Sequence, residues 1–194
     1  MSAVTTTTRD GLPRLAFEDI EPQLQKELGP TVERLGYFGE FFQVFAQVPG
    51  AVSAFMAYTK TVKAPLDDAQ NELLALAVCC AMNDRYECVQ HERLALKLGF
   101  TREWIAAAEG RADCDPGLLS PSEAALRRLA LAVLERQGSR CSAEVADVAA
   151  LIGAEKAAAA LLQVTRFVMI ATLCNALSLS LPVPSIFSDD NGPD

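Results

Sequence analysis

Histidine and tryptophan are scarce in this sequence, and each occurs once among 194 residues. A single histidine excludes metal centres built from several histidines, such as a three-histidine zinc site. Basic residues are also fewer than acidic ones, 17 against 25, and the formal net charge is −8. Because a nucleic-acid groove needs a basic face to neutralise phosphates, we expect no nucleic-acid partner.

Export signals and cysteine motifs are missing as well. The first eleven residues are polar and rich in threonine, unlike a signal peptide with its charged start and apolar stretch. The six cysteines form neither a C-x-x-C motif nor the paired spacing of a zinc site. Without export, reduced thiols are the default state. These features predict a cytoplasmic protein.

One apolar stretch, from Ala157 to Leu181, is long enough to suggest a membrane span. Arg166 lies inside it, and a central arginine costs about 2.5 to 3.5 kcal/mol on insertion scales. A helix buried by the rest of the protein, or by a sister subunit, explains the same composition. We therefore expect no membrane partner.

Strand signals are almost absent, whereas signals for the ends of helices are frequent. Gly29-Pro30 is expected to separate two helices, Asn83-Asp84 to break and restart the chain, and Gly99 to end a helix. Ser120 to Glu123 is a capping box. The sequence predicts an all-α single domain of about eight helices at residues 16–182, between a flexible N-terminal tail (1–15) and a C-terminal tail (183–194).

The segment from Asn71 to Gly99 carries the chemically most informative side chains. Glu72 is a lone carboxylate near the start of an apolar helix, and a buried carboxylate must be paired, hydrogen-bonded or neutral. The next helix places four polar groups on one face by their spacing: Asp84, Glu87, Cys88 and His91. If the two helices form a hairpin, Glu72 and His91 face each other.

A carboxylate that orients an imidazole makes a general base tuned near neutral pH. Ordinary structural roles account for the same spacing: Glu87 and His91 are also a common helix pair, and Asp84 is a common helix cap. Spacing alone leaves both interpretations open.

This segment resembles the core of the alkylhydroperoxidase D and carboxymuconolactone decarboxylase-like family. The family motif is a Glu, a C-x-x-C that begins twelve residues later, and a His four residues after the second Cys. Glu72 and His91 fall on the Glu and His positions, and the text LALKLGFTREWI that follows is also similar. The resemblance extends more weakly from about Pro30 to Leu181. It implies an all-α fold and a homo-oligomer, a trimer or a hexamer.

Asp84 and Glu87 stand where the peroxidase members carry their two redox cysteines. The text DRYECVQH resembles instead a subgroup that lacks the thiol pair, with Cys88 at a position usually held by Trp. A hydroperoxide reductase needs one thiolate to attack the peroxide and a second thiol to resolve the sulfenic acid. Cys88 could take the first role and Cys79 or Cys80 the second, which keeps a thiol-dependent alkyl hydroperoxide reductase as an alternative.

The decarboxylase branch implies a cofactor-free enzyme with a carboxylate-and-histidine proton-transfer site. Such an enzyme must stabilise an enolate and deliver a proton. We assign acid–base catalysis to His91, its orientation to Glu72, and second proton or polarising roles to Glu87 and Asp84. Arg166 is the candidate for binding a substrate carboxylate, with Arg85 a weaker one; an ion pair between Arg166 and Glu72 is the structural alternative.

The favoured hypothesis is thus a decarboxylase-like enzyme acting on a small carboxylate- or carbonyl-bearing molecule. A second alternative is a non-catalytic oligomeric ligand-binding protein, because a fold alone does not define a function. Carboxylates with one histidine also suit iron or manganese, but such sites usually carry paired Glu-x-x-His motifs. We expect neither a metal nor a cofactor.

Overall fold

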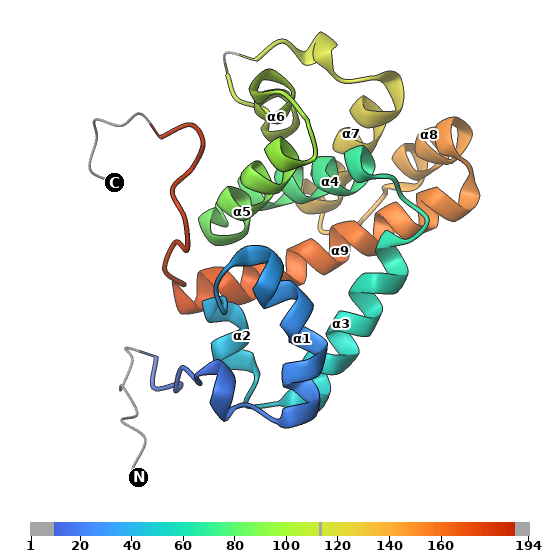
Figure 1. Ribbon diagram of the computed structural model, residues 1–194. Coiled ribbons are helices and arrows are strands. Elements are labelled where there is room, and N and C mark those ends of the chain that lie inside the picture. The colour runs from blue at the N-terminus through green and yellow to red at the C-terminus, as the bar shows by residue number, and fades with distance from the viewer. Residues whose placement is uncertain (1–9, 113, 189–194) are drawn as a thin grey trace. The chain divides into compact units, whose positions relative to one another are not determined.

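The computed structural model describes residues 10–112 and 114–188. This part of the chain contains nine α-helices, two short 3-10 helices and no strand, which confirms the predicted all-α class (Figure 1). Backbone contacts divide the chain into two compact units, and the boundary along the sequence lies between Lys60 and Thr61.

The first unit is built around aromatic side chains. It contains a 3-10 helix (Phe17–Asp19), α1 (Pro22–Leu35), α2 (Glu40–Phe45) and most of α3 (Pro49–Lys63). Its core consists of buried aliphatic residues with phenylalanines packed against them: Ile20, Leu24, Leu28, Ala46, Val52, Phe17, Phe38, Phe42 and Phe45. The phenylalanines therefore form part of the core of this unit.

The predicted break at Gly29-Pro30 is wrong, because α1 continues through Pro30 to Leu35. A proline inside a helix removes one backbone hydrogen bond and costs about 3 kcal/mol. Leu24 and Leu28, both fully buried on one face of α1, offset this cost by their packing. The helix ends instead at Gly36, whose φ of 81° places it in the left-handed region.

The second unit surrounds α4 (Asp68–Ala81), which packs against four other helices: α5 (Arg85–Lys97), α6 (Arg102–Glu109), α7 (Pro121–Glu135) and α9 (Ala154–Leu177). A 3-10 helix (Pro116–Leu118) precedes α7, and α8 (Ser142–Ile152) packs against both α7 and α9 (Figure 1). Side chains from Gln70 to Cys79 are all buried, so α4 is the central helix of this unit.

Helix α9 is the one described helix that is long and apolar enough to cross a membrane by length and composition. More than half of its most apolar window, 56%, is buried within the protein. The contacts of α9 with α4, α7 and α8 account for this composition, as expected for a core helix.

The tails predicted at residues 1–15 and 183–194 fall partly outside the described residues. Of the N-terminal one, residues 10–15 contact α2: Leu15 N–H donates to Gln43 O at 3.0 Å, and Arg14 forms an ion pair with Glu40 at 2.8 Å. Of the C-terminal one, residues 184–187, which we term the C-terminal strap, contact α5 and α6.

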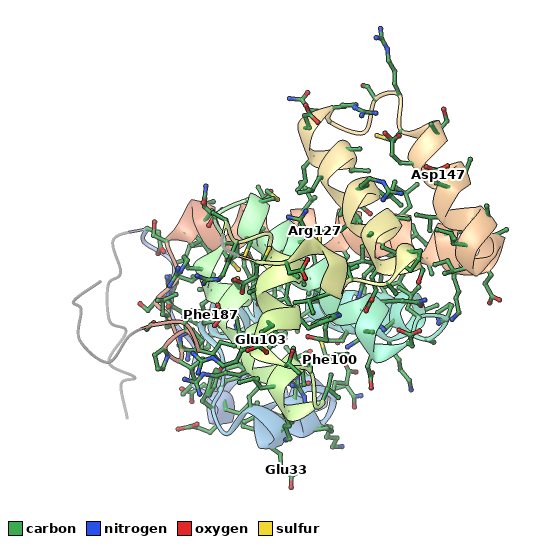
Figure 2. All side chains as sticks on the ribbon, turned by 90° about the horizontal axis from the view of Figure 1, so that it is seen from above. Glu33, Phe100, Glu103, Arg127, Asp147 and Phe187 are labelled. Carbon is green, nitrogen blue, oxygen red and sulfur yellow. The ribbon has the colours of Figure 1, made fainter. Side chains whose placement is uncertain are left out.

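A buried carboxylate on α5 holds this strap. Glu92 is 1% exposed, and the Ser185 hydroxyl donates to its carboxylate, with Oγ 2.7 and 2.9 Å from the two carboxylate oxygens. Glu92 also accepts from Ile186 N–H at 2.7 Å. Arg93 donates to Pro184 O. The guanidinium carbon of Arg111 lies 3.9 Å from the ring centroid of Phe187, the residue of the strap that Figure 2 labels. Because both Ser185 and Ile186 donate to it, Glu92 is the main anchor of the strap.

Replacing Glu92 with Ala should therefore release the strap. We expect hydrogen exchange at Ile186 and Phe187 to become at least tenfold faster, because an anchored amide exchanges only after local opening. Glu103→Ala, an exposed glutamate on α6, is the matched control and should leave exchange unchanged. Equal exchange rates in wild type and Glu92→Ala would contradict the anchoring role.

Candidate active site

The hairpin of α4 and α5 brings the predicted site residues together. Asp67 caps α4 through a capping box with Gln70, and α4 ends at Ala81. Asn83, with φ of 54°, turns the chain, and Asp84 then caps α5 by accepting from Glu87 N–H at 3.3 Å. The predicted break at Asn83-Asp84 is confirmed. Asparagine tolerates this left-handed conformation better than most residues, which explains why the turn occurs there.

The hairpin places Glu72 against His91, as predicted. His91 Nδ1 lies 2.7 Å from Glu72 Oε2, and the two side chains are 14% and 2% exposed. The imidazole ring also stands edge-on to Phe167 of α9, with centroids 5.2 Å apart. With Nδ1 engaged by Glu72, Nε2 is the nitrogen left for a substrate, and its nearest carboxylate is Glu87 at 3.7 Å.

These neighbours set the charge of His91. Burial opposes protonation of the ring, but the negative charge and hydrogen bond of Glu72, helped by Glu87, outweigh it and raise the pKa of His91 to about 9. The ring is therefore an imidazolium at neutral pH. The sequence predicted a general base near neutrality, whereas this geometry makes His91 a proton donor in the resting state.

Asp84 carries an unusual carboxyl group next to this pair. It is 1% exposed, and its Oδ2 has no hydrogen-bond partner among the described residues. Burial and the charge of Glu87 raise the pKa of Asp84 to about 6, although the backbone N–H groups of Glu87 and Tyr86 and the charge of His91 oppose the rise. Perturbed acids of this kind are more common at functional sites than elsewhere.

Arg166 reaches the same neighbourhood through Phe167. Its guanidinium carbon lies 4.0 Å from the centroid of the Phe167 ring, which also contacts His91. Its Nε donates to Gln163 at 2.8 Å. Glu72, which the structural alternative pairs with Arg166, contacts His91.

Cys88 points away from this pair. Successive residues of a helix are about 100° apart around its axis, so Cys88 and Glu92 share one face while Glu87 and His91 share the next. Its side-chain partners are Cys80 Sγ at 2.9 Å, Glu109 Oε1 at 3.6 Å and Glu92 Oε1 at 3.9 Å. Cys88 therefore does not share a face of α5 with Glu87 and His91, although the spacing predicted one common face.

Cys88 is poorly suited to attack a substrate. The hydrogen bond with Cys80, burial and the nearby charge of Glu109 raise the pKa of the Cys88 thiol far above its ordinary value. Because the thiolate is the nucleophile, a thiol held in its neutral form reacts slowly. Cys79 and Cys174 are also buried, and burial raises their pKa values as well.

Glu109, at the end of α6, is a site residue that the sequence analysis missed. Its side chain is 2% exposed and accepts from Arg111 Nε at 2.6 Å. Burial raises the pKa of Glu109, Arg111 opposes this, and the charge of Glu92 adds to it. No motif marks Glu109, because its partner Cys88 lies on another helix.

Gly110 and Arg127 fix the end of α6 where Glu109 lies. Gly110 has φ of 78°, and a Cβ there would overlap Arg127 Nη2. Arg127, labelled in Figure 2, donates to Ala108 O at 3.0 Å and to Glu109 O at 3.4 Å. A cation at the carboxyl end of a helix also complements the helix dipole.

The site thus has two parts, an acid–base pair and a thiol cluster. The cysteine and carboxylate donors close enough to share a metal ion are Cys80, Cys88 and Glu109, all within 4.8 Å of one another. Among the described residues, this set includes neither His91 nor the carboxylates of the α4–α5 hairpin predicted as site residues, Glu72, Asp84 and Glu87.

Solved structures show that the chain has an alkylhydroperoxidase D-like fold. A peroxidase-related protein with an AhpD core from Ralstonia eutropha JMP134 matches with a TM-score of 0.72 and 16% identity, over 93% of this chain and 94% of that one. The debrominase Bmp8 in complex with 2,3,4-tribromopyrrole matches with a TM-score of 0.71 and 16% identity, over 93% and 92%. An AhpD-type protein of unknown function from Agrobacterium tumefaciens matches with a TM-score of 0.64 and 17% identity, over 72% and 97%.

The sequence itself matches the Carboxymuconolactone decarboxylase family over residues 47–136. This range contains α4, α5, α6 and the Glu72–His91 pair. No curated protein matches the sequence. This match, together with the shared fold, supports the AhpD/CMD-like family that the resemblance of the Asn71–Gly99 segment predicts. That family includes enzymes, but at these identities the structural matches carry the fold alone.

Proposed function

We propose that the protein is a decarboxylase-like enzyme that uses proton transfer by His91 on a small carboxylate- or carbonyl-bearing substrate. The observation that carries the proposal is the 2.7 Å contact between His91 Nδ1 and the buried Glu72 carboxylate. The name of the matching family points to decarboxylation of an unsaturated lactone acid as the reaction.

The arrangement suits the second half of such a reaction. Loss of CO₂ from a carbon next to a carbonyl group leaves an enolate, which needs positive charge nearby and then a proton on carbon. An imidazolium with a pKa of about 9 supplies both from Nε2. Glu72 holds the ring in place and keeps it charged, so it acts as a positioning residue.

The other predicted residues take supporting roles in this proposal. Glu87, 3.7 Å from Nε2, can return a proton to His91 after each turnover. Asp84, with its pKa near 6 and an unpartnered oxygen, can polarise a substrate group. Arg166, whose guanidinium lies over the Phe167 ring, can attract the substrate carboxylate. The hydroperoxide reductase alternative needs Cys88 as a thiolate, and its buried, carboxylate-flanked position supports this less.

Carboxymuconolactone in heavy water is the probe that tests the proposal. The wild type should release CO₂ and leave one deuterium on the product carbon, and His91→Gln should lower the rate by about 10² to 10⁴, the usual contribution of a positioned acid or base. Glu103→Gln, on the exposed face of α6, should retain the full rate. No CO₂ release by the wild type, or an unchanged rate in His91→Gln, rejects the proposal.

We also propose that the chain acts in the cytoplasm as a trimer or a hexamer. Exposed apolar residues on the last two helices support self-association: Leu151 of α8 is 50% exposed, and Leu162 and Met169 of α9 are 47% and 43% exposed. Light scattering of the purified chain should give a mass of at least three protomers, and a monomer mass would count against this part.

A further inference from the structure

The thiols of Cys80 and Cys88 form a close pair outside the proposed acid–base site. Cys80 lies in the last turn of α4 and Cys88 in the first turn of α5, and the turn at Asn83 brings them together. Their sulfur atoms are 2.9 Å apart, and neither is in a disulfide. A disulfide bond is about 2.0 Å long, so the two sulfurs need to approach by only about 0.9 Å.

The two thiols differ in how they can be reached. Cys80 is half-buried, whereas Cys88 is 4% exposed and is the inner member of the pair. A reagent from solution therefore meets Cys80 first. Access also decides which thiol of a pair reacts first in thiol–disulfide exchange, together with the thiolate fraction of each.

A proton acceptor for the inner thiol is already in place. Cys88 Sγ donates to Glu109 Oε1 at 3.6 Å, and Arg111 holds the other oxygen of that carboxylate at 2.6 Å. Burial raises the pKa of Glu109, which makes it a stronger base than an exposed glutamate. Glu92, which anchors the C-terminal strap, lies 3.9 Å from the same sulfur, so the strap is attached at this cluster.

We propose that Cys80 and Cys88 are a redox-active dithiol, which low-molecular-weight disulfides oxidise to an intramolecular disulfide. The Cys80 thiolate attacks one sulfur of the reagent, and the first small thiolate leaves. Cys88 then gives its proton to Glu109 and attacks the Cys80 sulfur, which expels the second small thiolate. The protein loses two electrons, the reagent gains them, and the two thiol protons end on two small thiols.

A bound metal ion is the competing explanation for this cluster. Zinc holds thiolates at about 2.3 Å in a tetrahedron, which separates two sulfurs by roughly 3.8 Å. The observed 2.9 Å is shorter than that separation and lies nearer to a disulfide. The distance thus favours the dithiol, and zinc becomes one outcome of the test.

Glutathione disulfide is the probe, applied to the full chain in buffers of varied glutathione redox ratio. Mass spectrometry after alkylation should show two fewer reactive thiols and a cross-link between the peptides of Cys80 and Cys88. Cys88→Ser should stop at one glutathione on Cys80, and Cys80→Ser should react at least tenfold more slowly. Cys79→Ala, which removes the neighbouring buried thiol, is the matched control and should form the cross-link at the wild-type rate.

Glu109→Gln separates a proton acceptor from a merely structural residue. We expect the mixed disulfide at Cys80 to accumulate at neutral pH and to resolve at least tenfold more slowly, with the rate recovering as the pH rises. His91→Gln should form the cross-link normally, so failure of the proposed decarboxylase does not affect this test. A glutathione adduct that persists on wild-type Cys80, no cross-link at any redox ratio, or stoichiometric zinc binding that protects both thiols would overturn the dithiol.

Discussion

Replacing Glu72 with Gln should lower the pKa of His91 from about 9 to about 6.5 or below. Glutamine keeps a hydrogen-bonding oxygen near Nδ1 but removes the negative charge that stabilises the imidazolium. Burial of the ring, which favours the neutral form, then dominates. Because the chain has one histidine, its ring signals in an NMR titration report this pKa without ambiguity.

The same shift links stability to pH. The folded pKa of His91 lies above the unfolded value of about 6.5, so its contribution is fully present below pH 6.5 and is lost as the pH rises through about 9. We expect the wild type to lose up to about 3 kcal/mol of unfolding free energy across this window and Glu72→Gln to lose little. Glu87→Gln, whose carboxylate is farther from the ring, is the comparison and should lower the pKa less. A pKa unchanged in Glu72→Gln would contradict the pairing.

Replacing Asp84 with Asn should stabilise the protein at neutral pH by about 1 to 2 kcal/mol. The folded pKa of Asp84 is raised to about 6 from 3.8, so the carboxyl contributes favourably only when protonated, and this contribution is lost as the pH rises from about 4 through 6. Asparagine caps a helix as well as aspartate and carries no buried charge, although its amide donor also lacks a partner, which limits the gain. Urea unfolding at pH 4 and pH 7 measures the effect.

Asp67→Asn is the matched control for Asp84→Asn, because Asp67 caps α4 from an exposed position and has its hydrogen-bond partner. We expect a change within about 0.5 kcal/mol there. The Asp84→Asn gain should disappear at pH 4, where the native carboxyl is neutral. A lower free energy of unfolding for Asp84→Asn than for the wild type at pH 7 would contradict the prediction that the buried charge of Asp84 destabilises the folded protein.

Local sequence signals predicted the parts of the structure that local chemistry controls. The Asn83-Asp84 turn, the Ser120–Glu123 capping box and the facing of Glu72 and His91 all follow from residues near one another along the chain. A fixed spacing on two helices joined by a short turn determines such contacts. The expectation that Gly29-Pro30 ends a helix failed, because the packing of α1 outweighs the cost of a proline inside the helix.

Contacts between distant segments could not be predicted in this way. Glu109 meets Cys88 from a helix 21 residues away, and Ser185 meets Glu92 across 93 residues. The spacing of residues along the sequence does not predict which hydrogen-bond donor a buried carboxylate will have, because that depends on how the helices pack. The charge state of His91 was missed for the same reason: it depends on distances to two carboxylates and on burial.

The guanidinium of Arg127 occupies the space that any side chain at Gly110 would need. We therefore expect the two positions to change together: a larger residue at 110 requires a shorter one at 127, and the carbonyl groups of Ala108 and Glu109 then lose their donor. In related proteins, we expect substitutions at these two positions to occur in pairs rather than independently.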